Sequence, residues 1–449
     1  MALDRDEMNQ RRQRREEMRQ KQLQQQRKLQ IRLIIAAAVI IVCGAAIFAL
    51  SRNGGSEASA GESTPTGIAV TEAPTEEIAT QPPEEGVTTI HIKAAGDLNV
   101  TDLVVASGRT TLGYDYTKAF LDVAHVLSDA DLTMMNFEGN LIGEPYGTDS
   151  GSAPQQLVDA LAGAGVDILQ MANSYSIYNG LIGLNQTLNN IRAAGIEPVG
   201  AFSSPEEFRK SKGYTICEVQ GITVAVVAFT KSMGSLGLPE GSEDCVNKLY
   251  VDYESTYRDV DSDGIRKILR SVASERPDVT IAMLHWGAEY NDTIYDTQKS
   301  IISLMKKEGV DIIIGTHPHM VHEISLNEEE NFLVAYSLGD FFGDGTKGGT
   351  KYSIILDVEI TKDHDTGAVK IQGYDYIPIY TLAEDECDGQ RRVVRIDEAM
   401  AAYEVNFVDK ITKAAYNSMA NALERIEARV DPEAWAAKQE ALKNSAGET

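Results

Sequence analysis

Histidines are concentrated in one short stretch of the chain. Four of the seven, His285, His317, His319 and His322, lie within 38 consecutive positions. Neutral imidazole nitrogens combined with carboxylate oxygens suit zinc, manganese or iron. Pro318 restricts the backbone between its two histidine neighbours, so both rings can come from one extended turn. A single His-x-His pair is more often structural than metal-binding, so the interpretation depends on other residues that reach the same place.

Two carboxylates could complete such a site. Asp97 ends one β-rich run in a Gly-Asp pair, and Glu138 ends another in Asn-Phe-Glu. One terminal and one bridging carboxylate would hold two metal ions about 4 Å apart. We therefore predict one or two divalent ions (Mn, Zn or Fe), held by a set of five ligands: Asp97, Glu138, His285, His317 and His319.

The elements that must position these residues alternate along the chain. From Val87 onward, short β-rich runs alternate with amphipathic stretches of helical length, and later β-rich runs follow one another directly. This pattern predicts an α/β fold with a mixed sheet. Ligands in such folds bind beyond the carboxyl ends of the strands. Five polar signatures should therefore meet at one edge: Gly96-Asp97, Asn136-Phe137-Glu138, Ala172-Asn173-Ser174-Tyr175, His285-Trp286-Gly287 and Thr316-His317-Pro318-His319.

The order of these motifs (GD, N-x-E, A-N, HWGAEY, GTHPH and YSLG-x-F) resembles the CapA family of poly-γ-glutamate capsule proteins over residues 88–380. The resemblance implies a metallophosphatase-like four-layer α/β/β/α sandwich in an extracytoplasmic domain. It also implies a part in making or exporting an anionic γ-linked glutamate polymer. The five predicted ligands match the family's metal-binding motifs, and Asn136 and Glu289 match its supporting positions.

The chain departs from the family pattern at two places. Where the family reads A-N-N-H, Ser174 and Tyr175 replace the Asn-His pair that in metallophosphatases supplies a metal ligand and an imidazole facing the leaving group. A serine hydroxyl is a poor neutral ligand, and a tyrosine of pKa about 10 is a reluctant proton donor. Asp340 replaces an asparagine of the family's YSLGNF motif and could compensate by binding metal.

The remaining candidate residues are assigned by role. Asn173 and Tyr175 are the candidate catalytic residues. The candidate substrate-binding residues are Asn136, Trp286, Glu289 and His322.

Four interpretations of the altered site stay open. One metal could remain on Asp97, Glu138 and His319, or Asn173 could shift by one position and restore a second. The pocket could instead be metal-free and bind polymer or a partner, or the residues could be hydrogen-bonded strand ends without a present function. We expect a membrane-anchored CapA-like protein in capsular poly-γ-glutamate synthesis or export. The alternatives are a metal-dependent phosphoesterase or hydrolase at the cell surface and a non-catalytic binding module.

The segment before the predicted domain has the features of a membrane anchor. Residues 33–50 are eighteen residues without a charge, which as a helix span about 27 Å. The basic residues 1–32 should lie in the cytoplasm and the rest of the chain outside. A cleaved signal peptide fits less well, because the small residues 58–60 follow the apolar run too late. The Ser-, Thr-, Pro- and Glu-rich residues 51–87 predict a flexible stalk, and residues 381–449 a mostly helical extension.

Charge limits the partners. Residues 1–32 carry ten Lys and Arg against five Asp and Glu, so the formal net charge of -26 leaves -31 for the rest of the chain. Such a surface excludes nucleic acid as a partner. The expected partners are the cell membrane and poly-γ-glutamate or its synthase and export subunits, and an anionic polymer would need a bound cation or a patch of Lys231, Lys347 and Lys351. Cys217 and Cys245 are either a disulfide or free thiols.

Overall fold

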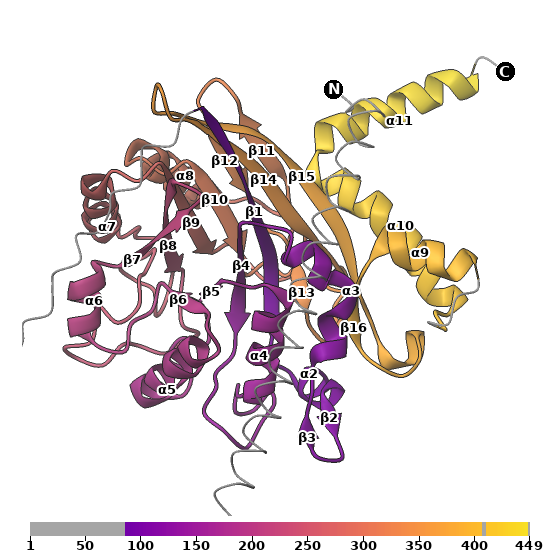
Figure 1. The fold of residues 1–449 in the computed structure, drawn as a ribbon, viewed down its shortest axis with the longest axis horizontal. Helices are drawn as coiled ribbons and strands as arrows, with labels where there is room; N and C mark the ends of the chain where they lie inside the picture. Colours follow the sequence, from indigo (N-terminus) through magenta and orange to yellow (C-terminus); the bar gives the residue numbers. More distant parts are fainter. Residues whose placement is uncertain (1–85, 406–409, 448–449) are drawn as a thin grey trace, which may run out of the picture. The chain divides into compact units, whose positions relative to one another are not determined.

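The computed structural model describes residues 86–405 and 410–447. The predicted cytoplasmic tail, the transmembrane helix at residues 33–50 and the stalk up to residue 85 lie outside the described residues. Within the described part, no helix has the length and apolar character needed to cross a membrane. The predicted α/β class with mixed sheets is confirmed (Figure 1).

The larger sheet has eight strands, in the order β16-β15-β14-β1-β4-β5-β6, with β13 paired to β1 outside this path. Strand β1 is parallel to β4 and β13 but antiparallel to β14, so the sheet is mixed. Its strands are β1 (Val87–Asn99), β4 (Leu132–Glu138), β5 (Ile168–Gln170), β6 (Glu197–Val199), β13 (Asp340–Phe342), β14 (Tyr352–Asp363), β15 (Ala368–Leu382) and β16 (Arg392–Arg395).

The smaller sheet has six strands, in the order β11-β12-β10-β9-β8-β7, and its three central pairings are parallel. Its strands are β7 (Tyr214–Val219), β8 (Ile222–Thr230), β9 (Val279–His285), β10 (Ile312–Thr316), β11 (Ile324–Asn327) and β12 (Phe332–Ala335). A separate short hairpin is formed by β2 (Arg109–Thr110) and β3 (Gly113–Tyr114).

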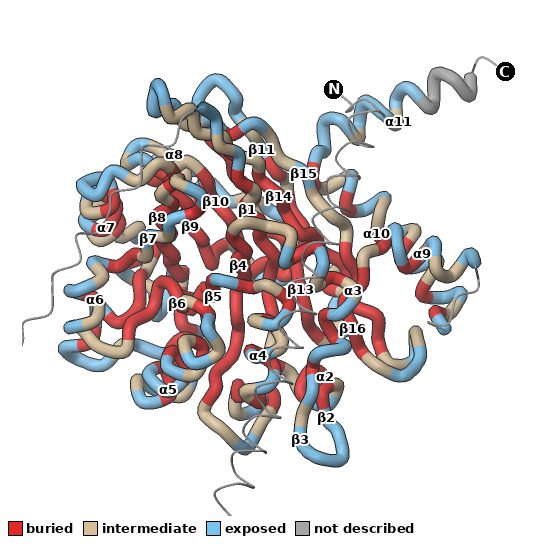
Figure 2. Tube along the Cα trace, viewed as in Figure 1, coloured by how far each residue is buried: buried red, intermediate tan, exposed pale blue. Residues whose placement is uncertain are grey.

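The two faces of the smaller sheet pack into different cores. Val226 and Met283 belong to the same buried cluster as Ile92 of the larger sheet. Their chain neighbours Val227 and Leu284 point to the opposite face, because side chains alternate along a strand, and pack with α7 and α8. The sheets therefore share one core, and the smaller sheet has helices on its outer face; Figure 2 shows the central strands as buried.

The helices cover the outside of the two sheets. α3 and α4 add buried leucines to the core of the larger sheet, and α10 packs on β14 and β15. The sequence region expected to be a mostly helical extension also contains β16, which extends the larger sheet. The helices are α2 (Asp102–Ser107), α3 (Thr117–Leu127), α4 (Gln155–Ala164), α5 (Gly180–Ala193), α6 (Pro205–Ser211), α7 (Ser262–Glu275), α8 (Asp296–Lys307), α9 (Ile396–Glu404), α10 (Lys413–Val430) and α11 (Pro432–Gly447), with the 3-10 turn η1 (Glu384–Glu386).

Four aspartates fix the register of the parallel strands at their amino ends. Each directly precedes a strand, and its carboxylate accepts a hydrogen bond of 2.7 to 2.8 Å from a backbone N–H of the neighbouring strand. The backbone N–H of each aspartate donates to the carbonyl of that same neighbouring residue. This two-point contact aligns the strands, so their carboxyl ends come level with one another. The four are Asp131, Asp167, Asp278 and Asp311.

The cysteine alternatives are also resolved. Cys217, Cys245 and Cys387 are all free thiols. The free-thiol alternative is therefore confirmed, and a Cys217–Cys245 disulfide is wrong.

Candidate metal centre

Strand register brings the predicted carboxylates to one level of the larger sheet. Asp97 on β1 lies opposite Asn136 on β4 and opposite Asp340 on β13. Two pairs further along, Asn99 lies opposite Glu138. In the smaller sheet, His285 lies opposite Thr316, the residue that precedes the two turn histidines. Hydrogen-bonded pairing thus places these polar signatures beside one another in two pairs, β1 with β4 in the larger sheet and β9 with β10 in the smaller one.

Strands β1 and β13 approach closely because residue 96 is a glycine. A Cβ atom built on Gly96 would lie 1.8 Å from the carbonyl oxygen of Gly339. The backbone N–H of Asp97 donates to that same oxygen over 2.9 Å. The Gly-Asp motif therefore has a physical reason: glycine permits the approach that places Asp97 beside Asp340.

A buried amide joins the two predicted carboxylate ligands. Asn136 Nδ2 donates to Asp97 Oδ1 over 2.7 Å and to Glu138 Oε1 over 3.0 Å. Its own carbonyl oxygen accepts from Asn173 Nδ2 over 3.0 Å. The backbone N–H of His317 also donates to Asp97 Oδ2, over 3.1 Å. These bonds hold both carboxylates in fixed orientations.

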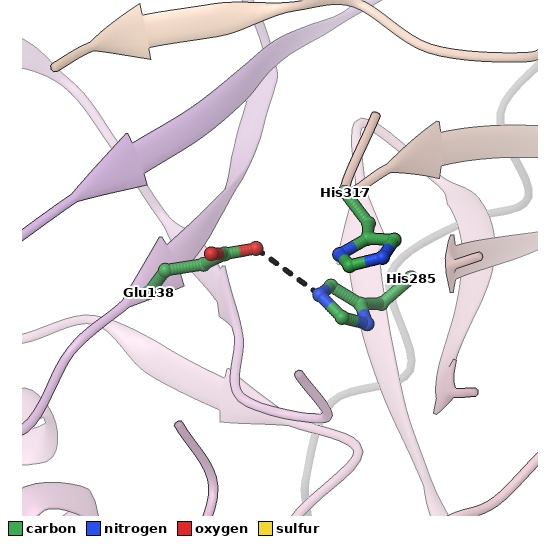
Figure 3. Close-up of side chains that lie close together, drawn as sticks. All are labelled: Glu138, His285 and His317. Carbon is green, nitrogen blue, oxygen red and sulfur yellow. Dashed lines mark hydrogen bonds and ion pairs between the residues drawn. The ribbon is translucent and has the colours of Figure 1, made fainter. Parts of the chain in front are cut away.

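The tautomer of His285 follows from its hydrogen bonds. Thr230 Oγ1 donates its single proton to the carbonyl of Ser232 over 2.7 Å, so at 2.9 Å it must accept from His285 Nδ1. The neutral ring then carries a lone pair on Nε2, which faces Glu138 Oε1 at 3.1 Å. Two acceptors facing each other need a proton or a metal ion between them. Figure 3 shows this pair, with the His317 ring beside His285.

His319 lies among carboxylates on the other side of the centre. Its Nδ1 is 2.8 Å from Asp340 Oδ1 and 3.5 Å from Asp97 Oδ2. Its Nε2 lies 4.0 Å from Glu138 Oε2. Asn99 Nδ2 donates to the same Asp340 oxygen over 2.8 Å.

Burial sets the protonation of the centre. It raises the pKa of Asp97 to about 7 and also raises the pKa of Glu138 and Asp340. It lowers the pKa of His285 to about 3 and holds the pKa of His317 well below its usual value, so both rings are neutral at pH 7.

His319 behaves in the opposite way. Burial disfavours its charged ring, but Asp340, Glu138 and Asp97 together outweigh burial and raise its pKa well above the usual value. The centre therefore combines two neutral imidazoles with one that carries a proton.

A cavity of about 610 Å³ opens above the centre. Of the predicted site residues, Glu138, Tyr175, Glu289 and His319 line it. Burial raises the pKa of Tyr175 to about 12, so its hydroxyl keeps its proton at neutral pH. The other three predicted ligands, Asp97, His285 and His317, lie beneath the cavity floor with at most 4% of their surface exposed.

Four residues predicted to act on substrate lie elsewhere. Asn136 and Asn173 are fully buried, and the side-chain oxygen Oδ1 of Asn173 accepts a hydrogen bond from the backbone N–H of Tyr175. Trp286 packs in the core beside α8, and its Nε1 donates to the Tyr336 carbonyl. His322 is buried away from the cavity lining. The structure thus gives these four no contact with the cavity.

Two further residues that line the cavity, Tyr290 and Asn99, were not predicted from the sequence. Tyr290 stacks on the His319 ring at 5.3 Å, and Lys347 lies over the Tyr290 ring at 5.9 Å. Asn99 lies two positions after Asp97 on the same strand face, so alternation could have indicated it. Tyr290 follows Glu289 in a turn beyond β9, where strand alternation does not apply.

The three lysines named as a possible cationic patch do not form one at the cavity. Lys347 lines the cavity. Lys231 instead donates to the Gly287 carbonyl, and Lys351 pairs with Glu386 at 2.8 Å.

The donor set fits a divalent metal. Three groups of three ligand atoms lie within 4.8 Å of one another. Two of them have no residue in common: Glu138, His285 and His317 in one, and Asp97, His319 and Asp340 in the other. The third combines the exposed Glu289 with His317 and His319, one histidine from each of these two groups. His317 Nδ1 is buried without a hydrogen-bond partner, which native structures rarely tolerate. An imidazole that binds a metal ion has such a nitrogen, without a hydrogen-bond partner in the metal-free protein. The two acceptor atoms of His285 and Glu138 that face each other also fit a metal ion between them.

Fold and centre define an α/β protein whose carboxylate and histidine cluster lies at the carboxyl ends of strands from two sheets. The chain belongs to the family described as bacterial capsule synthesis protein PGA_cap, which matches residues 91–344. The match covers more than half of the chain and contains every residue of the centre.

Three curated relatives match part of the chain. The PGA biosynthesis protein CapA of Bacillus subtilis is 26% identical over 222 residues, which are 49% of this chain and 54% of the relative. The capsule biosynthesis protein CapA of Bacillus anthracis is 26% identical over 268 residues, 58% of this chain and 61% of the relative. The probable polyglutamine synthesis accessory protein of Mycobacterium tuberculosis is 24% identical and is matched over 63% of its length. The chain therefore spans between half and two thirds of these relatives.

Solved structures give only a distant likeness. The calcineurin-like phosphoesterase YfkN of Bacillus subtilis is 16% identical, with a TM-score of 0.39 over 76% of this chain and 98% of that chain. A phosphatase of Mycoplasma pneumoniae is 15% identical, also with a TM-score of 0.39, over 66% of this chain and 94% of that chain. Likenesses of this size support no functional conclusion.

Proposed function

We propose that the chain acts at the outer face of the cell membrane in the synthesis or export of capsular poly-γ-glutamate, and that its buried centre engages the polymer through bound divalent cations. The observation that carries this proposal is the convergence of carboxylates and imidazoles from two sheets beneath one open cavity. We also propose that the two sheets with outer helices form a metallophosphatase-like four-layer sandwich. Membership of the capsule-synthesis family supports the biological role.

Electrostatics explains why cations are needed. Asp97, Glu138 and Asp340 give the centre a charge of -3 when all three are ionised and His319 has given up its proton to bind metal, and the whole chain carries -26. A polymer of glutamate carboxylates is repelled by such a field. One divalent ion reduces the charge of the centre to -1, and two change it to +1. Bound metal thus supplies a local cationic point on an acidic protein.

The chain's own residues would then orient the polymer. Bound divalent metal would supply Lewis-acid attraction for carboxylate oxygens. Tyr175, with its retained proton, can donate a hydrogen bond from the cavity wall. Lys347 on the rim adds a positive charge that is exposed to solvent.

Phosphoesterase activity is less well supported. The positions of the family's Asn-His pair carry Ser174 and Tyr175, and a phenol of pKa about 12 is a poor acid for a leaving group. The side-chain oxygen Oδ1 of Asn173 accepts a hydrogen bond from the backbone N–H of Tyr175, and Asn173 does not line the cavity. If the protein is a hydrolase, it should turn over a phosphodiester in the presence of manganese, and His317→Ala should abolish that turnover.

We further propose that residues 33–50 anchor the chain in the membrane with residues 1–32 in the cytoplasm. The uncharged run of eighteen residues and the basic excess before it support this orientation. A cysteine-labelling experiment with a membrane-impermeant reagent tests it, in a chain whose four native cysteines are replaced by serine. A cysteine introduced at residue 60 should react in intact cells, and one introduced at residue 20 should not.

Deletion of the gene in its host tests the function. Surface poly-γ-glutamate should disappear and return with the wild-type chain, but not with His285→Ala. His125→Ala is the matched control, because that histidine is 42% exposed on α3 and should restore the polymer. Unchanged polymer in the deletion strain, or a host without any such polymer, would refute the proposal.

A further inference from the structure

The geometry points to two unlike cation subsites in this centre, and we propose that Asp340 creates the difference. In this proposal Asp97, Asp340 and His319 form an oxygen-rich subsite for a hard cation such as Mn²⁺ or Mg²⁺. Glu138, His285 and His317 form a nitrogen-rich subsite for Zn²⁺ or a similar ion. The inference rests on the proposed metal-dependent function and adds to it a ligand and a metal preference.

Asp340 is placed as a ligand by its strand. It is the first residue of β13, which pairs in parallel with β1, so its backbone lies opposite that of Asp97. Its side chain is 5% exposed, and Oδ1 lies 2.8 Å from His319 Nδ1. Ligand atoms of Asp97, His319 and Asp340 all lie within 4.8 Å of one another. Three chain segments thus present two oxygens and one nitrogen to a single point.

Buried charge is the second reason to place a cation between Asp97 and Asp340. Asp97 and Asp340 are at most 5% exposed, and each pairs with the one imidazole of His319. Asn99 and Asn136 add hydrogen bonds to the two carboxylates but no charge. When both carboxylates are ionised, a single imidazole cannot neutralise them, and an uncompensated buried charge is costly. A divalent cation between the two oxygens would match their charge.

The second subsite has its own independent signature. His317 Nδ1 is buried without a partner, although the residue is only 4% exposed. The Nδ1 proton of His285 is held by Thr230, so Nε2 offers its lone pair toward Glu138. Imidazole ligands that donate their other N–H to a fixed acceptor are typical of metal sites. This subsite therefore offers two nitrogens and one oxygen.

The donor counts predict different preferences. Carboxylate oxygens suit hard ions such as magnesium and manganese, whereas imidazoles favour zinc and its neighbours. Asparagine at position 340 would leave the first subsite with one carboxylate and one imidazole. The substitution Asp340→Asn should therefore weaken the hard-ion subsite and leave the zinc subsite intact.

Metal titration of the full-length chain, purified in detergent and stripped with a chelator, tests this assignment. Mn²⁺ binding is followed by electron paramagnetic resonance and Zn²⁺ binding by calorimetry. Asp340→Asn should weaken Mn²⁺ binding by about 10-fold or more and change Zn²⁺ affinity by less than about 2-fold. The matched control is Asp344→Asn, which removes the same charge from the cavity wall outside both ligand groups and should change neither affinity by more than about 2-fold.

Two results would overturn the proposal in different ways. If the wild-type chain binds neither ion, the metal-dependent function fails, and this inference fails with it. If the wild-type chain binds both ions and Asp340→Asn binds Mn²⁺ equally well, only the assignment of Asp340 is overturned. Because an amide oxygen can still accept from Asn99, the variant should unfold at the wild-type temperature in excess chelator. If Asp340→Asn unfolds at a lower temperature than the wild type, His319→Ala is measured instead, and it must lose Mn²⁺ binding while keeping Zn²⁺ binding.

Discussion

Replacing Thr230 with valine tests the tautomer of His285, on which the nitrogen-rich subsite depends. The threonine is the last residue of β8, fully buried and directly opposite His285 in the strand register. Its hydroxyl accepts from His285 Nδ1 over 2.9 Å and donates to the Ser232 carbonyl over 2.7 Å. Valine has nearly the same shape but offers neither bond.

The expected effect follows from where the imidazole proton goes. Without the hydroxyl, the proton can move to Nε2 and donate to Glu138, which lies 3.1 Å away. That tautomer satisfies the metal-free protein but blocks the metal-binding nitrogen. Removing an outer partner of this kind weakens metal binding by about 10- to 100-fold, or about 1.4 to 2.7 kcal/mol.

Zinc titration by calorimetry measures the change, with two comparison variants. Thr230→Ser keeps the hydroxyl and should stay within about 3-fold of the wild type. Thr133→Val makes the same exchange at another fully buried threonine, whose hydroxyl donates to the Leu127 carbonyl far from the ligand groups. Zinc affinity that is the same in Thr230→Val and in the wild type would show that the tautomer was assigned wrongly.

Three further predictions concern the scaffold. Gly96→Ala should destabilise the fold by about 2 to 4 kcal/mol in urea unfolding, because its Cβ would meet the Gly339 carbonyl at 1.8 Å. The control is Gly373→Ala, which should cost less than about 1 kcal/mol because a Cβ there would have nothing within 4 Å. Burial raises the folded-state pKa of Asp311 from 3.8 to about 6, so the folded protein becomes less stable as pH rises from 4 through 6 and this carboxyl group loses its proton. The loss in the free energy of unfolding is at most about 3 kcal/mol. Asp311→Asn should make the urea midpoint less dependent on pH between pH 4 and 7. Arg391, 3% exposed, donates to the Gly343 and Asp344 carbonyls, so Arg391→Met should speed hydrogen exchange about tenfold in residues 343–350, and equal rates in both proteins would contradict this role.

Sequence could predict the centre wherever one strand determined the direction of a side chain. Asp97 and Glu138 follow buried strands, and parallel pairing places both at one edge. The same rule correctly applied would have removed Trp286, because consecutive residues point to opposite faces. His285 faces the shared core between the sheets, so its neighbour must face the helices, and it does. This error came from treating a motif as a unit rather than as two sides of a strand.

The other features of the centre and the fold depend on contacts between segments that are distant in the sequence. Asn136 and Asn173 carry the amides that sequence assigned to substrate or metal, but their hydrogen bonds run to each other and to the carboxylates beneath the cavity. No local pattern distinguishes an amide that supports a ligand from one that is a ligand. The division into two sheets was likewise invisible in the β-rich runs and came only from the family resemblance.

Asp340 shows why a departure from a family pattern can be informative. Seen alone, a carboxylate in place of an amide looks like the loss of a family feature. The presence of Ser174 and Tyr175 where the family has an Asn-His pair strengthens that impression. The register of β13 against β1 places the new carboxylate beside Asp97 and within 2.8 Å of His319. The chain therefore lacks an imidazole at one end of the centre and gains an oxygen at the other. A centre altered in this way has exchanged one donor type for another, which favours a change of metal or ligand over simple decay.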